Sequence, residues 1–350
     1  MKFIRPQYLR DFRCLADRCG DTCCAGWEIC IDPESYKKYQ RMPGAMGERL
    51  RASILCGEAG AEFVLRPGKR CPFLNERNLC ELILELGEDS LCEICREHPR
   101  FYLNVGGETL TGLGLCCEEA ARLILTRDLR LETVDCPDEG AATVPEDAPE
   151  DEVLLLKTAW QNALGFVERA EFPLAQQMSG LLVWGEALQE ALEFGEALPG
   201  LAPLEAAPQN APGDWRALIP IFQRLEVLDA SWPELLQQAL KNAGSALAVP
   251  EFEPYARRLT RYFLYRHFLQ AIYDGDVLSK IKFSLLSVCV ICALAAHRLS
   301  EQGALSESDW IALAKRYSME IEYSDENVDA LWDACWKEPA LETQSLVSLF

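Results

Sequence analysis

Apolar residues recur at helical spacing through the second half of the chain. Val153, Leu156, Trp160 and Leu164 are three or four residues apart, so they would share one face of a helix. The same periodicity predicts helices over roughly 152–170, 173–195, 215–228, 232–243, 251–273, 277–300, 306–317 and 325–336. An Ala- and Pro-rich break over 198–214 interrupts the series, because proline and glycine disfavour a continuing helix.

The first third of the chain has shorter and more varied patterns. In "IDPESYKKYQRM", Asp32 is placed to cap a helix whose first residue is Pro33. Two β-prone runs within 101–115 flank Gly106-Gly107, which predicts a hairpin, and the following "CCEEAARLILTRDL" predicts a helix with acidic residues in its first turn. We therefore expect a mainly α protein, with a Cys-rich, loop-rich α+β N-terminal domain that contains a β-hairpin, followed by an α-helical body.

The composition divides the chain in the same way. Residues 1–136 form the expected Cys-rich domain, which would hold a metal or an iron–sulfur cluster. Residues 137–151 are acidic and rich in Pro, Ala and Gly, which is typical of an exposed linker. Residues 152–350 form the expected helical domain, with the break near 198–214 inside it.

The formal net charge of −21 limits the possible partners. A strongly acidic surface argues against nucleic acid and against an anionic membrane as partners, and it favours a basic substrate, unless the charge serves only solubility.

The helix "YARRLTRYFLYRHF" mixes arginines and aromatic residues, a combination that can bind nucleic acid. In so acidic a chain we interpret it as an amphipathic helix, with the holding of an anion such as a carboxylate as an alternative use.

Two absences in the sequence point to the cytoplasm. The start, "MKFIRPQYLRDFRC", lacks the apolar run of a signal peptide. The longest apolar run, Phe283–Ala296, is about 14 residues, which is shorter than the roughly 18 that a membrane span needs and predicts a buried helix. In the cytoplasm disulfides are rare, and clustered cysteines more often bind metal or carry out chemistry.

Thirteen of the 16 cysteines precede residue 137. Thiolates are soft ligands that suit zinc and iron–sulfur clusters. Structural zinc sites usually show two CxxC pairs, whereas this region has only Cys92–Cys95 and otherwise irregular spacings with surplus thiols. The pattern therefore favours an iron–sulfur cluster, while zinc and unligated reduced thiols stay as alternatives. His98 could be a further metal ligand or could cap the following strand.

The order of these motifs resembles the flagellin lysine-N-methylase family. The resemblance rests on "CGDTCCAGWEICID", "CPFL…LC…LGE", "C-x-x-x-PR" and "C-x-E-A-A-R-L-I-L", and continues into the body at "YFLYRHFLQAIYDGDVLSKIKFSLL". The Cys-rich domain also resembles zinc- or iron-chelating cysteine-cluster proteins. The chain departs from the family pattern at His98, where an aromatic residue is expected, and at Glu118, where proline is expected.

The resemblance implies a protein-lysine N-methyltransferase. It would transfer methyl groups from S-adenosylmethionine to surface lysines of a protein, with flagellin as the family's substrate, and would use an iron–sulfur cluster, most simply 4Fe-4S. The motif cysteines implied as metal ligands are Cys14, Cys19, Cys23, Cys24, Cys71, Cys80, Cys95 and Cys117. The alternative function is a non-enzymatic zinc- or iron-chelating or electron-transfer module that binds a partner protein.

The residues themselves assign neither a cofactor loop nor a catalytic base. "TGLGLCC" contains Gly112 and Gly114 but lacks the acidic residue of a ribose site, so we interpret it as a tight strand. Glu28, an acid close to the first cysteines, is the one candidate base for the substrate lysine.

Overall fold

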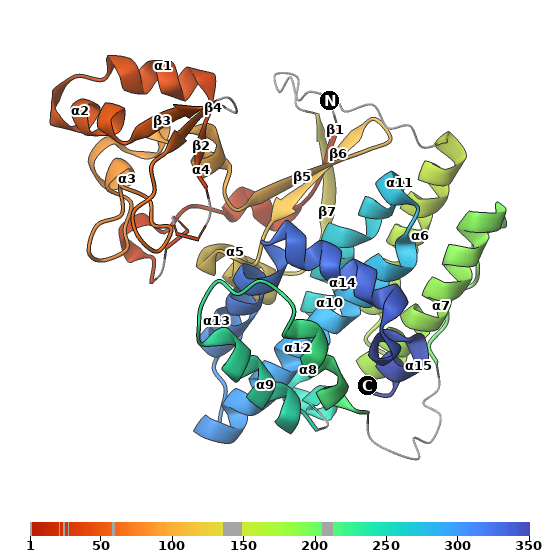
Figure 1. The fold of residues 1–350 in the computed structure, drawn as a ribbon. Coiled ribbons are helices and arrows are strands. Elements are labelled where there is room, and N and C mark those ends of the chain that lie inside the picture. Colours follow the sequence, from red (N-terminus) through yellow and green to blue (C-terminus); the bar gives the residue numbers. More distant parts are fainter. Residues whose placement is uncertain are drawn as a thin grey trace.

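A computed structural model describes residues 2–20, 22–23, 25–26, 28–57, 60–135, 149–204, 213–244 and 246–350. In these ranges the chain forms a small lobe, a four-stranded sheet and a helical body (Figure 1). Helices predominate, and the strands fall in the N-terminal part of the chain. This confirms the predicted fold class.

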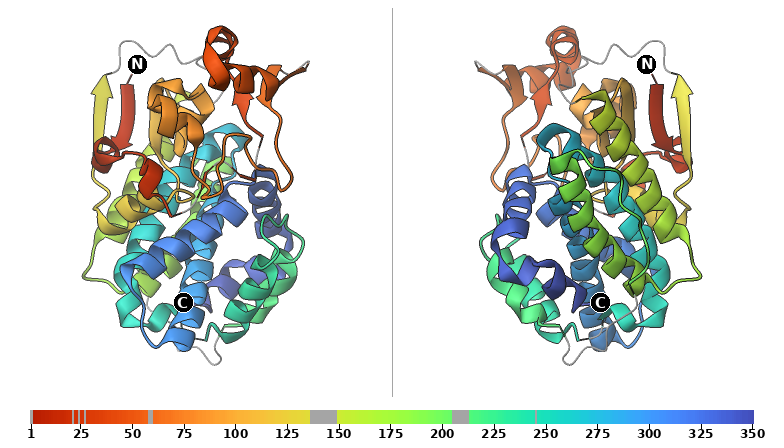
Figure 2. Two further views of the ribbon diagram at one scale, coloured as in Figure 1. Left: turned by 90° about the vertical axis from the view of Figure 1, so that its left-hand side faces the viewer. Right: turned by 90° about the vertical axis from the view of Figure 1, so that its right-hand side faces the viewer.

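The small lobe, residues 28–97, projects from the rest of the molecule (Figures 1 and 2). It consists of the antiparallel strands β2 (Cys30–Ile31), β4 (Gly60–Phe63) and β3 (Ile54–Gly57), in that order across the sheet, and of helices α1 (Pro33–Arg41), α2 (Gly44–Ala52), α3 (Glu81–Leu86) and α4 (Glu93–Glu97). The predicted cap of α1 is confirmed, because the Asp32 carboxylate accepts a hydrogen bond from the Ser35 N–H at 2.9 Å. The lobe has its own hydrophobic core, which includes Tyr39, Leu50 and Phe73.

A four-stranded sheet connects the small lobe with the body. Its strands are β5 (Arg100–Val105), β6 (Glu108–Leu113), β1 (Lys2–Pro6) and β7 (Leu131–Asp135), in that spatial order. The predicted hairpin is confirmed as β5 and β6, and both turn residues, Gly106 and Gly107, have positive φ. Strand β1 runs parallel to β6 and antiparallel to β7. The sequence did not predict β1 or β7, because neither "KFIRP" nor "LETVD" shows a clear apolar alternation.

The body is a set of helices that begins with α5 (Glu118–Thr126). It continues with α6 (Glu150–Glu168), α7 (Leu174–Phe194), α8 (Ile219–Phe222), α9 (Trp232–Asn242), α10 (Glu253–His267), α11 (Ala271–Asp274), α12 (Val277–Gln302), α13 (Glu307–Tyr317), α14 (Asp325–Lys337) and α15 (Thr343–Val347). The helix predicted over 215–228 is wrong in its second half, since helical structure ends at Phe222. The backbone N–H groups of Leu228 and Asp229 donate instead to the Glu320 carboxylate, at 2.9 and 3.1 Å.

Helix α12 runs through the middle of the body. Helices α7, α9, α10, α13 and α14 all pack against it (Figure 2). Among the described residues it is long and apolar enough to cross a membrane, but its most apolar 18-residue window is 100% buried inside the protein. This confirms the prediction of a buried helix around Phe283–Ala296.

The predicted domain boundaries stay predictions. Most of the acidic linker, residues 137–148, lies outside the described residues, and α6 begins at Glu150. Within the described chain, the core cluster of the body also takes in Tyr8, Val105 and Leu125, which precede the predicted boundary at 136. Within the predicted Cys-rich domain, the small lobe has a hydrophobic core of its own.

Candidate functional site

A cavity of about 100 Å³ lies where the small lobe meets the body, and cysteine is the commonest residue in its lining. The thiols around it are those of Cys14, Cys19, Cys23, Cys71, Cys80, Cys92, Cys95, Cys116 and Cys117. Seven of the eight predicted metal ligands are among them, and the eighth, Cys24, lies outside the described residues. Four separate stretches of sequence thus bring their thiols to one place.

Backbone geometry positions several of these thiols. Cys80, Cys92 and Cys117 each directly precede a helix, α3, α4 and α5 respectively, and Cys95 lies within α4. The Asp32 carboxylate, which caps α1, also accepts the Glu93 N–H at 2.8 Å and so fixes α4 beside α1. The arrangement of α1 and α4 therefore holds the Cys92–Cys95 pair at the cavity wall.

The remaining described cysteines lie elsewhere. Cys30 and Cys56 are exposed and do not line the cavity, whereas Cys289, Cys292 and Cys335 are buried in the body core. Cys136 lies outside the described residues. Two thiols that fall outside the family pattern, Cys92 and Cys116, do line the cavity; the CxxC spacing with Cys95 was a signal for Cys92, whereas spacing gave none for Cys116.

Burial controls the protonation of the cavity thiols. It raises the pKa of Cys71 and of Cys117 to about 12, and it raises the pKa of Cys116 well above its ordinary value. The pKa of Cys92 moves the other way because Cys95 donates a hydrogen bond to it. Mostly protonated, buried thiols are poor nucleophiles, and they become thiolates when a bound cation compensates the charge.

The donor set suits a soft metal group that spans several thiols. Among the described residues, no three Cys, His, Asp or Glu side chains come close enough to enclose one metal ion. The thiols are instead spread around a cavity that is several times the size of a single water site. By their chemistry, such thiols suit zinc and iron–sulfur clusters alike.

The two departures from the family pattern both face this cavity. His98 Nε2 lies 3.6 Å from Cys116 Sγ, and burial together with the nearby Arg266 lowers the pKa of His98 to about 4, so the imidazole is neutral. Glu118 Oε2 accepts a hydrogen bond from the Gly20 N–H at 3.1 Å, which ties the first cysteine loop to α5. Both residues that depart from the family pattern, His98 and Glu118, therefore contact other residues at the site.

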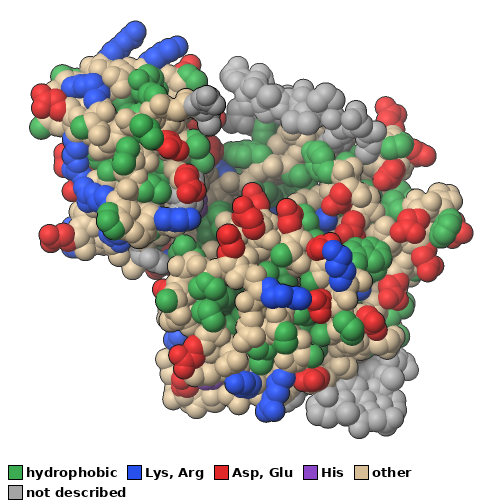
Figure 3. Space-filling view, viewed as in Figure 1, with side chains coloured by type: hydrophobic (Ala, Val, Ile, Leu, Met, Phe, Trp, Pro, Cys, Tyr) green, Lys and Arg blue, Asp and Glu red, His purple; other side chains and the backbone are tan. Residues whose placement is uncertain are grey.

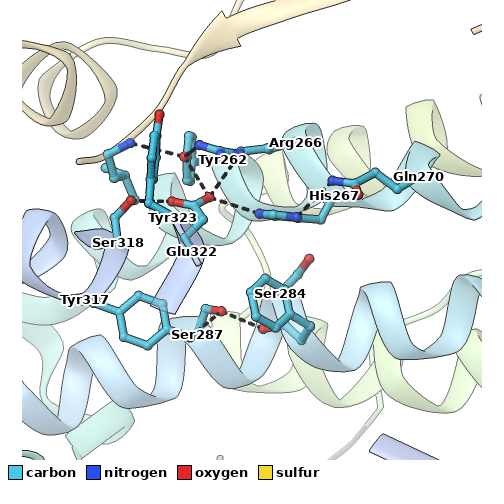
Figure 4. Close-up of polar contacts among 12 residues, drawn as sticks. Tyr262, Arg266, His267, Gln270, Ser284, Ser287, Tyr317, Ser318, Glu322 and Tyr323 are labelled. Atoms are coloured by element: carbon cyan, nitrogen blue, oxygen red, sulfur yellow. Dashed lines mark hydrogen bonds and ion pairs between the residues drawn. The ribbon is translucent and has the colours of Figure 1, made fainter. Parts of the chain in front are cut away.

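A buried polar network lies in the body, between α10 and the turn that follows α13 (Figure 4). Glu322 ends a π-helical turn, Ser318–Glu322, and its side chain is completely buried. Its carboxylate accepts hydrogen bonds from Tyr262 Oη at 2.8 Å, His267 Nε2 at 2.9 Å and Ser318 Oγ at 2.6 Å. Arg266 Nε lies 3.3 Å away as the counter-ion.

The ionisation of this network follows from its contacts. Burial alone would raise the pKa of Glu322, but the Arg266 charge and the hydrogen bond from His267 lower it to about 2. Burial lowers the pKa of His267, and Gln270 donates to its Nδ1 at 3.2 Å, so a neutral imidazole donates from Nε2. The buried pair is therefore a Glu322 carboxylate with an Arg266 guanidinium.

The network reaches the cavity through two contacts. Tyr262 Oη accepts the N–H of Leu115, the residue before Cys116, at 3.2 Å. The Arg266 guanidinium lies over the ring of Tyr323, 4.9 Å from its centroid, and a Cβ at Gly114 would lie only 2.0 Å from the Tyr323 hydroxyl. The lack of a side chain at Gly114 therefore allows Tyr323 and Arg266 to approach the backbone closely. This agrees with the interpretation of "TGLGLCC" as a tight strand. Glu322 was not among the residues predicted for the site; its one signal in the sequence is an acid between Ile321 and Tyr323.

A second cavity, of about 420 Å³, adjoins the first. The two share Cys23, His98 and Cys116, and the second is lined by the carboxylates of Glu28, Glu226, Glu320 and Glu326. On the face shown in Figure 3, acidic side chains gather along α14, beside the hollow between the small lobe and the body. A negatively charged cleft thus opens next to the cysteine cavity.

The C-terminal part of the body matches a known family. Residues 186–349 match the FliB lysine N-methylase C-terminal domain. The matched range starts within α7 and includes the network residues Arg266 and Glu322. The cavity thiols all precede residue 118 and lie outside it.

Individual relatives extend the family resemblance. The chain is 29% identical to the lysine-N-methylases of Salmonella choleraesuis and Salmonella typhimurium over 126 residues, which are 34% of this chain and 31% of each relative. The same identity links it to the flagellar biosynthetic protein FliU of Salmonella muenchen, where the match covers 75% of that protein. The chain is a distant homologue of these proteins, although the match spans about a third of the two lysine-N-methylases. No solved structure matches the chain.

Proposed function

We propose that this protein is a cytoplasmic protein-lysine N-methyltransferase that uses S-adenosylmethionine and modifies flagellin or a similar lysine-bearing protein. The family match of the body and the names of the Salmonella relatives support the reaction and the substrate. The observation that carries the proposal is the convergence of the predicted thiols on one cavity beside an acidic cleft.

We further propose that the cysteine cavity holds an iron–sulfur cluster, with 4Fe-4S as the simplest form. The ligands would come from Cys14, Cys19, Cys23, Cys24, Cys71, Cys80, Cys95 and Cys117, with Cys92 and Cys116 as additional candidates that the geometry supplies. Such a cluster would supply an iron site at which S-adenosylmethionine can bind. The Asp32 bridge and the Glu322 network keep the surrounding thiols in position.

The acidic cleft suits the substrate side chain. A methyl transfer forms an N–C bond at the lysine Nζ, breaks the S–C bond of the sulfonium, and requires the lysine to lose a proton. The carboxylates of Glu28, Glu226 and Glu326 would attract the lysine ammonium group into the cleft. Glu28, which is exposed there and lies on the same cleft as Cys23, is our candidate for the proton acceptor.

The cluster is tested by metal analysis of the full chain purified without oxygen. We expect iron and acid-labile sulfide, with visible absorption that dithionite bleaches. Cys19→Ser, Cys23→Ser, Cys95→Ser and Cys117→Ser should each lose iron, whereas Cys30→Ser and Cys56→Ser, which change exposed thiols away from the cavity, should retain it. Colourless protein with one zinc per chain would contradict the cluster.

The reaction is tested by mass spectrometry of flagellin after incubation with S-adenosylmethionine. We expect methyl additions on surface lysines that require both the cofactor and the loaded protein. If the loaded protein binds flagellin but adds no methyl group, the chain is a chelating or electron-transfer module instead. Methylation that continues after iron removal would separate the reaction from the cluster.

A further inference from the structure

We propose that a third cavity, separate from the two described above and lying along α10, binds a small oxyanion through a phosphate or carboxylate group. This cavity has a volume of about 290 Å³, and four arginines, Arg127, Arg257, Arg258 and Arg261, line it together with Tyr8 and the two acids Asp128 and Glu168. It shares no lining residue with the cysteine cavity. Four arginines around one cavity are unusual in a chain whose formal net charge is −21.

One of the four arginines is fully occupied by the fold. Arg257 donates to the Val167 carbonyl at 2.5 Å and to Gln177 Oε1 at 2.6 Å, and it pairs with Glu253 at 2.6 Å. These contacts hold the turn between α6 and α7 against α10. Arg257 therefore helps to build the wall of the cavity and is not available to a ligand.

Arg261 has an open donor. Its Nη2 donates to the Leu129 carbonyl at 2.8 Å and lies 3.5 Å from the Glu168 carboxylate. Its Nε is buried and has no acceptor among the described residues. Because nearly all buried N–H groups in proteins are paired, an unpaired guanidinium nitrogen at a cavity wall points to an acceptor that comes from outside the chain.

Two further guanidinium charges are uncompensated. Within the described chain, neither Arg127 nor Arg258 makes an ion pair, and Asp128, the acid next to Arg127, lies 3.7 Å from Arg130. Arg258 and Arg261 are three residues apart on α10, so they lie on the same face of the helix. The cavity thus carries an excess of positive charge within an acidic protein.

The geometry of the donors selects the class of ligand. A guanidinium group presents parallel N–H donors that match the two oxygens of a carboxylate or phosphate. Tyr8 adds a phenol, and burial raises its pKa, so the hydroxyl stays neutral and can donate a hydrogen bond. A planar or tetrahedral oxyanion would accept a hydrogen bond from Arg261 Nε and would balance the positive charges of Arg127 and Arg258.

The test is calorimetric titration of the full chain with inorganic phosphate and, separately, with citrate. We expect saturable binding of at least one of them, and the stronger of the two identifies the favoured group. Arg258→Gln, which removes no hydrogen bond or ion pair within the described chain, should weaken binding at least tenfold, as should Arg261→Gln. Arg216→Gln, at an exposed arginine outside the cavity, should bind as the unaltered protein does.

The outcomes separate clearly. A normal circular dichroism spectrum together with weakened binding in Arg258→Gln supports the site even if Arg261→Gln is less stable. No saturable binding of either anion, or equal affinity in Arg258→Gln and Arg216→Gln, would overturn the proposal. The result is independent of methyl transfer, because binding is measured without S-adenosylmethionine or flagellin.

Discussion

The small lobe and the helical body are stabilised in different ways. The body is built around α12, whose apolar window is completely buried, and its core cluster extends from Tyr8 to Leu349. The core of the small lobe consists of eleven buried residues, two of which are the cavity thiols Cys71 and Cys92. Small units bury a lower fraction of their surface and often depend on metals for stability. The body therefore relies on apolar burial, whereas the small lobe has a smaller core to which two cavity thiols contribute.

The largest effect should come from removing the metal group. If the small lobe depends on its thiol ligands, an iron chelator should make residues 28–97 sensitive to protease while the body keeps its helical content, because binding and folding free energies are coupled. Limited proteolysis with fragment mass analysis, followed by circular dichroism, measures both regions. If residues 28–97 resist the protease equally well with and without the chelator, the small lobe does not depend on its thiol ligands more than the body does.

The next effect should come from the buried network of the body. Glu322→Gln leaves Arg266 buried without its counter-ion, which should cost roughly 3–5 kcal/mol of unfolding free energy. Glu301→Gln, on the more exposed end of α12, should change it by less than about 0.5 kcal/mol. Urea denaturation followed by tryptophan fluorescence provides the comparison. A similar small loss in both variants would contradict the ionised pair.

The same carboxylate predicts an acid dependence. The pKa of Glu322 is about 2 in the folded protein against 4.5 ordinarily, so its contribution is fully present above pH 4.5 and is lost as the pH falls through 2. In the unaltered protein the stability should therefore decline across this interval by more than it does in Glu322→Gln. Urea midpoints at several pH values within the interval measure the difference. Parallel pH profiles for the two proteins would contradict the lowered pKa.

A smaller effect should appear where the two regions meet. Gly114→Ala places a methyl group against the Tyr323 hydroxyl and Arg266, and such overpacking costs roughly 1–3 kcal/mol. Gly165→Ala is the matched control, because nothing lies within 4 Å of its added Cβ in α6, and it should stabilise the protein by about 0.5–1 kcal/mol. Opposite signs for the two variants in thermal unfolding would confirm the close approach at Gly114.

The smallest effect concerns the cap of the small lobe. Asp32→Ala removes the acceptor for the Ser35 and Glu93 amides and should cost about 1 kcal/mol. The pKa of Asp32 is lowered: burial opposes the shift, but hydrogen bonds from these amides outweigh it, so the contribution is lost as the pH falls below the ordinary value for aspartate. Amide hydrogen exchange should show faster exchange at the start of both α1 and α4. Faster exchange confined to α1 would contradict the bridging role.

The sequence correctly predicted those features that depend only on neighbouring residues, namely helix starts and turns. Asp32 with Pro33 gave the start of α1, and Gly106-Gly107 gave the hairpin, because capping and turn geometry depend on neighbouring residues. The spacing of the cysteines also indicated a shared site, although it could not show that Cys92 and Cys116 line the same cavity. Those positions depend on how the small lobe is placed against the body.

Long-range contacts account for what the sequence did not show. Residues 223–229 have a helical pattern, but the Glu320 carboxylate captures the backbone amides of Leu228 and Asp229 from more than 90 positions along the chain. The pairing of Arg266 with Glu322 similarly joins two helices that are distant in sequence. Periodicity carries no information on such partners.

The order of pairing in the four-stranded sheet has a consequence for synthesis. Strand β1 lies between β6 and β7 in the sheet, so that Lys2 is paired with Glu108 of β6 and with Asp135 of β7. Both of these neighbours are synthesised much later than β1. On the ribosome, the entire small lobe is therefore completed before its supporting sheet can close. We therefore expect Cys71, Cys80, Cys92 and Cys95 of the small lobe to be placed by its own helices before β6 and β7 are available, so that the cavity wall they form exists before the sheet closes.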